Sequence, residues 1–362
     1  MKKDWTYKKL GEVCDINYGT RVVQKKDGGS IYPVYGGGGA TFRMDTYNRE
    51  DCLVVARFAM SPKCTRIVKG KFFLNDSGLT LDAHEELYQD YLNWHIISLN
   101  DEIYQTAKGA AQKNLDVKAF TSLKIAIPPL SIQRSIVAEL DLLHSVISKK
   151  KEQLRELDNL AQSLFYQMFG DPITNPMGWE IKKLGEVAPV KSYQGDIVSE
   201  KGLYWLLNLD MVEAQTGKIL EKNMLDKDEI GNSTTSFSPD NVLYSKLRPY
   251  LNKVVLPDTC GYCTTELLPL LPQKDILNRE YLCYLLRSKS FVDYINTKVA
   301  GAKMPRVTMD DFRNFPIPLP PLSLQQSFTA KVSAIEAQKQ AITLSIKETE
   351  ALLAQRMDTY FS

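Results

Sequence analysis

Residues 5–13 read Trp-Thr-Tyr-Lys-Lys-Leu-Gly-Glu-Val, and residues 179–187 read Trp-Glu-Ile-Lys-Lys-Leu-Gly-Glu-Val. These segments differ at two positions and are offset by 174 residues. A second pair, Pro-Pro-Leu-Ser-Ile-Gln at 128–133 and Pro-Pro-Leu-Ser-Leu-Gln at 320–325, recurs at an offset of 192 residues. The chain is therefore a long internal repeat, and its second half has 18 more residues between the landmarks.

The halves diverge almost completely between these landmarks. Matching segments predict a shared scaffold, whereas diverging interiors predict surfaces shaped for different ligands. A repeat this long is not a solenoid unit, and 362 residues suffice for two domains with cores of their own. We therefore expect a duplicated domain with approximate two-fold symmetry.

Composition points to a soluble protein. Hydrophobic residues make up 44% of the chain and charged residues 24%, as in ordinary globular proteins. No apolar stretch approaches the roughly 20 residues that a bilayer span requires. The lysines near Met1 are not followed by an apolar segment, so we expect no secretory signal and a cytoplasmic location.

The six cysteines are expected to be reduced thiols, because a cytoplasmic chain of this length does not need a disulfide framework. Cys260-Gly-Tyr-Cys263 has the spacing of half a zinc site, but no second close pair of Cys or His follows it. We therefore expect no metal, with a zinc site as the less favoured alternative to a pair of buried thiols.

Each Pro-Pro landmark is followed by a long predicted helix. From Ser131, a candidate N-cap, to Phe169 there is no Pro or Gly, and the copy begins after Ser323. Apolar residues recur at alternating steps of three and four, which predicts coiled-coil seams that pair the helices or bind a partner. The seam residues are Leu140, Leu143, Ile147, Leu154 and Leu157 in the first helix, and Val332, Ile335, Ile342 and Ile346 in the second.

Polar residues interrupt both seams, at Lys150 in the first helix and at Lys339, Thr349 and Arg356 in the second. Such residues set register or meet another protein. An antiparallel pair would act as a spacer with one globular domain at each end; the alternative is that each helix folds back over its own domain. The Pro- and Gly-rich segment 170–178 ends the first helix and links the halves.

These landmarks resemble those of the specificity subunit of type I restriction-modification systems, over the full chain. The resemblance rests on the Trp-x-x-x-x-Leu-Gly-Glu-Val opening, the element Ile317–Gln325, the long helix and the Phe-Gly-Asp-Pro link at 169–172. Residues 32–40 and 240–254 are also similar to family segments, with Gly38 where Asn is common. The chain departs from the family pattern where its first domain meets the first helix. It has Ala126-Ile127-Pro128 there, whereas the second half has Pro318-Leu319-Pro320.

The resemblance implies two target-recognition domains, each of which reads one half of a split, asymmetric DNA sequence. It also implies that the helices hold the spacing and bind two modification subunits, which carry S-adenosylmethionine and methylate adenine. Restriction subunits join for cleavage. The resemblance places S-adenosylmethionine, ATP and Mg²⁺ on partner subunits, and no cofactor on this chain.

We therefore predict an α+β fold, with two mixed α/β target-recognition domains joined by two long antiparallel coiled-coil helices in a pseudo-two-fold repeat. The predicted ranges are 1–130 for the first recognition domain, 131–170 for the first helical spacer, 171–178 for the linker, 179–322 for the second recognition domain and 323–362 for the second helical spacer.

Since the net charge is only +2, a DNA-binding surface must be locally basic. The segment Cys52–Asn75 contains five basic residues and no acidic residue. Arg suits guanine, Gln suits adenine and Lys suits phosphate, although a solvated surface is the alternative for any one of them. The candidate DNA-binding residues are Arg21, Lys25, Arg57, Lys63, Arg66, Lys69, Gln112 and Lys113 in the first half, and Lys246, Arg248, Tyr250, Lys253, Lys303 and Arg306 in the second.

No catalytic motif is evident. The run Gly36–Gly39 lacks the ending of a P-loop and is better interpreted as a turn near DNA. The Asn/Asp-Pro-Pro-aromatic motif of adenine methyltransferases is missing, and Asp116-Val-Lys118 is too short to indicate a nuclease. We predict a non-catalytic DNA-recognition subunit; the alternatives are a coiled-coil adaptor that binds proteins and, less favoured, a self-contained enzyme.

Overall fold

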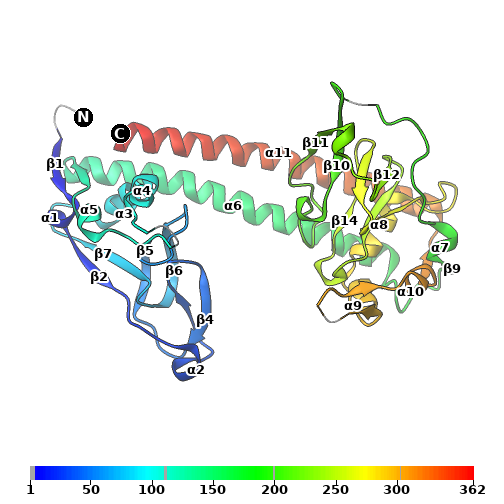
Figure 1. Ribbon diagram of the computed structural model, residues 1–362, viewed down its shortest axis with the longest axis horizontal. Helices are drawn as coiled ribbons and strands as arrows, with labels where there is room; N and C mark the ends of the chain where they lie inside the picture. The colour runs from blue at the N-terminus through cyan, green and yellow to red at the C-terminus, as the bar shows by residue number, and fades with distance from the viewer. Residues whose placement is uncertain (1–4, 110–111, 199, 302) are drawn as a thin grey trace. The chain divides into compact units, whose positions relative to one another are not determined.

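The computed structural model describes residues 5–109, 112–198, 200–301 and 303–362 (Figure 1). The chain divides into two compact units. Unit 1 contains the described residues up to Glu152 together with Thr343–Ser362, and unit 2 is Gln153–Ile342. Unit 1 thus combines most of the first half of the repeat with the last turns of the second, and the last part of the first helix belongs to unit 2. None of the helices in the described ranges is both long enough and apolar enough to cross a bilayer.

Unit 1 has a two-stranded antiparallel sheet of β1 (Thr6–Lys9) and β8 (Lys124–Ile127), and a six-stranded sheet in the order β2-β7-β5-β6-β3-β4. The six strands are β2 (Cys14–Tyr18), β3 (Tyr32–Tyr35), β4 (Ala40–Met44), β5 (Arg49–Ala56), β6 (Thr65–Leu74) and β7 (Gly78–Ala83). Its short helices are α1 (Leu10–Val13), α2 (Gln24–Asp27), α3 (Gln89–Ser98), α4 (Asn100–Thr106) and α5 (Val117–Thr121).

Unit 2 repeats the two-stranded sheet with β9 (Glu180–Lys183) and β19 (Pro316–Leu319), but its remaining strands are arranged differently. A four-stranded sheet has the order β11-β10-β15-β12 and a three-stranded sheet the order β14-β13-β16. These strands are β10 (Leu203–Leu207), β11 (Asn223–Asp226), β12 (Thr234–Phe237), β13 (Val242–Ser245), β14 (Val254–Val255), β15 (Gly261–Thr264) and β16 (Leu267–Leu270).

The other elements of unit 2 are short. The helices are α7 (Leu184–Val187), α8 (Arg279–Arg287), α9 (Lys289–Asn296) and α10 (Met309–Arg313), with 3₁₀ turns η1 (Leu209–Met211), η2 (Lys227–Glu229) and η3 (Pro249–Leu251). A hairpin joins β17 (Val299–Ala300) to β18 (Arg306–Val307). Both units therefore mix helices and sheets, as the sequence predicted.

Two 40-residue helices follow the two-stranded sheets: α6 (Leu130–Phe169) and α11 (Leu322–Phe361). Each begins one residue before its expected cap, so Ser131 and Ser323 lie inside the first turn and are not caps. The carbonyl of the proline before each helix accepts the first helical hydrogen bonds, so no serine hydroxyl is needed there.

A buried glutamine in the first turn anchors each long helix to its domain. Gln325 accepts a hydrogen bond from the backbone N–H of Asn278 (2.8 Å) and donates to the carbonyls of Ile276 (3.0 Å) and Pro320 (2.8 Å). Gln133 makes the same three contacts in unit 1, with Tyr88, Glu86 and Pro128. The Pro-Pro-Leu-Ser-x-Gln landmark is therefore a structural joint.

A tyrosine completes the joint in both units. The Tyr91 hydroxyl donates to the Ala126 carbonyl (3.0 Å), and the Tyr281 hydroxyl donates to the Pro318 carbonyl (2.8 Å). Because each tyrosine bonds a backbone carbonyl at the same place in the strand, the sequence difference between the joints does not alter them.

In unit 1 the first part of α6 runs antiparallel to the last turns of α11. Glu139 forms an ion pair with Arg356 (Oε1–Nε 2.9 Å). Further along α6, Lys150 donates to Ser345 Oγ (2.6 Å) and Thr349 Oγ1 (3.1 Å). Three of the polar residues that interrupt the apolar seams are thus paired across the helices, where they fix the register.

In unit 2 the last part of α6 contacts the first part of α11, again antiparallel. Lys339 pairs with Asp158 (2.6 Å), and Phe165 and Phe169 pack against Phe328 with ring centroids 5.9 and 5.3 Å apart. Since the C-terminal turns of α11 pack in unit 1, this helix does not fold back over its own domain alone, and that alternative is excluded.

The end of α11 covers the core of unit 1. Phe361 stacks on His95 (centroids 4.7 Å apart) and lies 5.5 Å from Tyr91. Leu353 and Met357 pack against the same cluster. His95 is buried and its Nδ1 has no hydrogen-bond partner among the described residues, so burial lowers the pKa of this histidine to about 3.

Replacement of Gln325 tests the joint. Gln325→Leu should lower the free energy of unfolding by about 3 kcal/mol, because one buried N–H and two buried carbonyls lose their partner. Urea denaturation followed by circular dichroism measures this change. Gln326→Leu, at the exposed neighbouring position, is the matched control, and equal stability of the two variants would contradict the role of the joint.

His95 should make stability depend on pH. Its pKa is about 3 in the folded chain against an ordinary value of 6.5, so unfolding takes up a proton below pH 6.5. Stability present above pH 6.5 should fall by about 1.4 kcal/mol per pH unit as the pH drops toward 3. In urea denaturation at pH 7 and pH 5, His95→Phe should lose this dependence, whereas His84→Gln, at a half-exposed histidine, should keep it.

Candidate DNA interface

Three segments of unit 1 meet around Arg57, which directly follows β5. Its backbone N–H donates to the Ser77 carbonyl (2.8 Å) in the β6–β7 turn, and its carbonyl accepts from the Leu115 N–H (2.9 Å). The Met60 N–H donates to the Lys113 carbonyl (2.9 Å). Two predicted DNA-binding residues that are far apart in the sequence, Arg57 and Lys113, therefore lie in one cluster.

The glycine run 36–39 between β3 and β4 packs against this cluster. A Cβ at Gly37 would lie 2.7 Å from the Phe58 carbonyl oxygen, so only glycine fits. Arg66 Nη2 donates to the Gly37 carbonyl (2.7 Å). At Gly38 and Gly39 no heavy atom would lie within 4 Å of an added Cβ, so the tip of the loop faces open space.

The Arg57 guanidinium lies over two aromatic rings. Its Cζ lies 4.7 Å from the centroid of the Tyr18 ring and 4.6 Å from that of Phe58. Cation–π attraction favours this placement and restrains the guanidinium. Within the described part of the chain no carboxylate pairs with Arg57, so its positive charge is available to a ligand.

Lys246 occupies the corresponding position in unit 2, directly after β13. Its backbone N–H donates to the Glu266 carbonyl (3.0 Å) and its carbonyl accepts from the Val307 N–H (3.0 Å). Arg57 has the same pair of backbone contacts in unit 1. The repeat has therefore kept one backbone position at the end of this strand, while the side chains around it differ.

In unit 2 a carboxylate lies beside the cation at this position. Arg306 Nε and Nη2 both contact Glu266 Oε1, at 3.0 and 2.9 Å, and the Lys246 Nζ lies 4.0 Å from Glu266 Oε2. The hydrogen bond to Glu266 raises the pKa of Arg306. Arg306 is thus engaged within the chain.

The predicted residues at 246–253 and those at 303–306 come together in unit 2. Arg248 has a left-handed backbone (φ 49°), and its N–H donates to the Pro305 carbonyl (2.8 Å). Lys253 Nζ donates to the Leu209 carbonyl (2.6 Å), so it too is engaged within the chain. Tyr250 and Lys303 are exposed.

The remaining predicted residues of unit 1 are spread over its surface. Lys63 adjoins the cluster, because Arg66 Nη2 lies 3.4 Å from the Lys63 carbonyl. The others are exposed and make no hydrogen bond or ion pair with Arg57 in the described structure: Arg21, Lys25, Lys69 and Gln112.

Sequence reasoning missed four residues of these clusters: Tyr18, Phe58, Ser77 and Glu266. A signal existed for the last two. When Asp51 is aligned with Asp240, at an offset of 189 residues, Arg57 falls on Lys246 and Ser77 on Glu266. Nothing in the sequence links Tyr18 to Arg57. Tyr18 ends β2 and Arg57 follows β5, and β7 lies between these two strands in the sheet.

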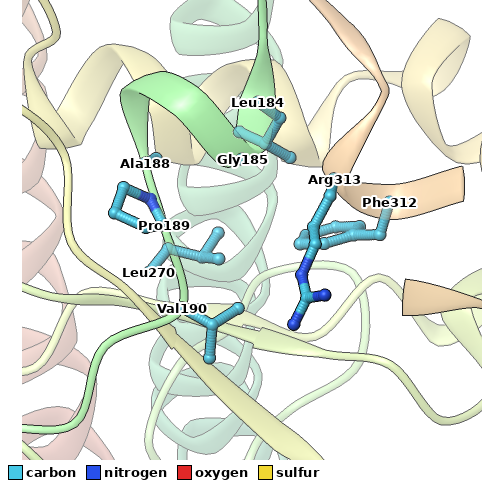
Figure 2. Close-up of a pocket in the computed structure, with 8 residues that line it drawn as sticks. All are labelled: Leu184, Gly185, Ala188, Pro189, Val190, Leu270, Phe312 and Arg313. Atoms are coloured by element: carbon cyan, nitrogen blue, oxygen red, sulfur yellow. The ribbon is translucent and has the colours of Figure 1, made fainter. Parts of the chain in front are cut away.

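One pocket of unit 2 lies between α7 and α10, and Figure 2 shows Arg313 across from Ala188 and Pro189 in it. Its volume is about 170 Å³. Arg313 is the charged residue of its lining, and no predicted DNA-binding residue contributes to it. Ligand pockets usually have roughly 300–1,000 Å³, so this one is too small for an ordinary cofactor.

The cysteine pair at 260 and 263 lies at β15. Cys263 is buried, and its thiol donates to the Thr235 carbonyl (3.4 Å). Burial raises the pKa of Cys263 to about 12, which keeps the thiol protonated. Among the residues that the structure describes, no group of three or more His, Cys, Asp or Glu side chains could hold a metal ion.

Both halves of the repeat match a known family model. The model of the type I restriction modification DNA specificity domain matches residues 2–159 and again residues 176–349. The chain belongs to this family. Its role is accordingly DNA sequence recognition, as a specificity subunit of a type I restriction-modification system.

Curated specificity subunits are similar along most of the chain. The type I restriction enzyme EcoDI specificity subunit of Escherichia coli is 18% identical, with 96% of this chain and 85% of the relative covered. The MjaVIII specificity subunit of Methanocaldococcus jannaschii is 22% identical, with 78% and 72% covered.

Solved structures share the fold of this specificity subunit. The type I restriction-modification S subunit from M. genitalium matches with a TM-score of 0.61 at 13% identity, covering 100% of this chain and 98% of that one. A chain from a study of complex assembly and conformational transition of the type I R-M system matches with a TM-score of 0.52 at 18% identity, covering 100% and 98%. The fold of two α/β domains with long helices is thereby confirmed.

A pair of glycine variants tests the cluster around Arg57. Gly37→Ala should push the loop away from Phe58 and lower the free energy of unfolding by about 1–3 kcal/mol, because the added Cβ meets a backbone oxygen. Gly38→Ala should be close to neutral, because its Cβ meets open space. Thermal denaturation of both variants checks this, and equal effects would contradict the close packing at Gly37.

Proposed function

We propose that this chain is the non-catalytic recognition subunit of a type I restriction-modification complex and reads a split, asymmetric DNA target, one half with each domain. A cytoplasmic location, where the host DNA lies, belongs to the same proposal. The sequence of each half-site depends on loop geometry and side chains that differ between the domains.

The observation that carries this proposal is the shared position of Arg57 and Lys246. Both residues directly follow a strand, β5 or β13. The N–H of each donates to the residue just before the strand that pairs with its own, β7 or β16, and its carbonyl accepts from a residue shortly before α5 or α10. Around them the side chains differ: two rings and Ser77 in unit 1, a carboxylate and Arg306 in unit 2. A common frame with different side chains suits two halves of an asymmetric sequence better than a single repeated site.

The long helices are proposed to set the distance between the half-sites and to bind two modification subunits. Large apolar side chains are exposed along them, at Leu142 and Leu160 on α6 and at Leu344 and Leu352 on α11. Exposed leucines on a helix pair favour contact with a protein partner.

The chemistry is assigned to the partners. Adenine methylation would use S-adenosylmethionine on the modification subunits, and cleavage would use ATP and Mg²⁺ on restriction subunits. What this chain contributes is recognition: its described residues offer basic clusters and loops at the strand ends, which suit contacts to phosphates and base edges.

Selection from random-sequence duplex DNA tests the proposal. The chain, purified with its modification subunits, should enrich a motif of two short defined parts separated by a gap of any sequence. Enrichment of no motif would contradict the proposal and favour the protein-binding adaptor. Methyl transfer by the chain alone, with S-adenosylmethionine, would contradict its non-catalytic role.

Exchange of one domain tests whether the two domains act independently. When residues 191–315 are replaced by the corresponding segment of another specificity subunit, only one half of the enriched motif should change. The other half should persist, because unit 1 keeps its loops and its joint. The same selection measures this outcome, and a change in both halves would contradict independent recognition.

A further inference from the structure

We propose that Arg57 reads a guanine in the half-site of the first domain, through the major-groove edge of the base. This inference rests on the proposed function and adds to it a residue, a base and the groove. Nothing in the family match or in the relatives assigns a base to this side chain.

The first step is the orientation of the guanidinium. Two rings form a clamp on it: its Cζ lies 4.7 Å from the Tyr18 centroid and 4.6 Å from the Phe58 centroid. A guanidinium has a planar fork of donors that matches O6 and N7 of guanine. Contact with both rings restrains the side chain before DNA binds, so less side-chain entropy is lost on binding.

The second step is the state of the charge. The described residues place no carboxylate on Arg57, and Tyr18 is 44% exposed, so the clamp is open to solvent. Lys246, at the same backbone position in unit 2, has Glu266 beside it, and Arg306 is bonded to that carboxylate through two nitrogens. Of the two equivalent positions, therefore, the one in unit 2 has a carboxylate beside its cation, and the described residues show none beside Arg57 in unit 1.

The third step is the space around the clamp. Gly37 brings the glycine run against Phe58, while Gly38 and Gly39 leave open volume where larger side chains would project. A loop without side chains lets a DNA strand approach the clamp closely. Arg66, the next arginine in the chain, is tied to the Gly37 carbonyl and supports this loop.

The experiment uses the complex with its modification subunits and first assigns the motif halves by the domain exchange described above. In the half read by unit 1, a guanine should be fixed at one position. Arg57→Gln should lower the preference for that guanine on the order of 10- to 100-fold and leave the other half unchanged. Arg57→Lys keeps the charge without the fork, and should weaken the preference for guanine while retaining affinity for DNA in general.

A modified base separates recognition from structural support. Duplexes with 7-deazaguanine at that position lack the N7 acceptor. The unaltered complex should bind these duplexes on the order of tenfold more weakly than duplexes with ordinary guanine. The Arg57→Gln complex should bind both kinds of duplex equally. Tyr18→Leu should give an intermediate loss. Lys246→Gln is the matched variant at the equivalent position, and should affect only the other half.

The outcomes distinguish the inference from the function beneath it. If the unaltered complex enriches no split motif, the proposed function fails. If it enriches a split motif without a fixed guanine in the first half, or if 7-deazaguanine weakens Arg57→Gln as much as the unaltered complex, the assignment of Arg57 is overturned while the proposed function stands. The assignment of Arg57 is supported if 7-deazaguanine weakens the unaltered complex but not Arg57→Gln, and if the variants keep the melting temperature of the unaltered chain.

Discussion

The amide of a glutamine buried at the start of each long helix is the contact on which the rest of the structure depends. Gln133 and Gln325 each make three hydrogen bonds that tie the first turn of a helix to the segment before it and to the loop before α3 or α8. Because a buried amide left without partners is costly, the helix has one favourable angle of departure from its domain. The pairing of α6 with α11 within each unit depends on that angle. So does the register that places Lys150 and Lys339 against their partners.

Much of this frame could be predicted from the sequence, because its signals are local. The Trp-x-x-x-x-Leu-Gly-Glu-Val segments and the Pro-Pro-Leu-Ser-x-Gln segments recur in order. The first contain β1 and β9, which pair with β8 and β19, the strands directly before the second. Apolar steps of three and four predicted both 40-residue helices to within one residue at their starts. The sheets between the landmarks were beyond such reasoning. Strand pairing is non-local, and the six-stranded sheet of unit 1 has no counterpart of the same order in unit 2.

The candidate site was predictable as charge but not as geometry. Basic composition alone pointed to Arg57, Arg248 and Arg306 together, yet the three side chains differ in what they are free to do. Arg306 is bonded to Glu266, and Arg57 lies against the rings of Tyr18 and Phe58. Phe58 is the next residue after Arg57, but Tyr18 and Glu266 lie about 40 positions from their arginines in the sequence, and their proximity depends on the sheets. A count of lysines and arginines therefore locates a basic surface without ranking its members.

The contact of Phe361 with His95 and Tyr91 has a consequence for biosynthesis. A nascent chain leaves the ribosome from its N-terminus, and the first domain would emerge with its aromatic core uncovered. The turn that covers it is made more than 200 residues later. Such distant contacts slow folding and prolong the exposure of apolar surface. Completion of the first domain is therefore coupled to the synthesis of α11, and a ribosome that stalls inside α11 would hold a chain whose first domain is unfinished.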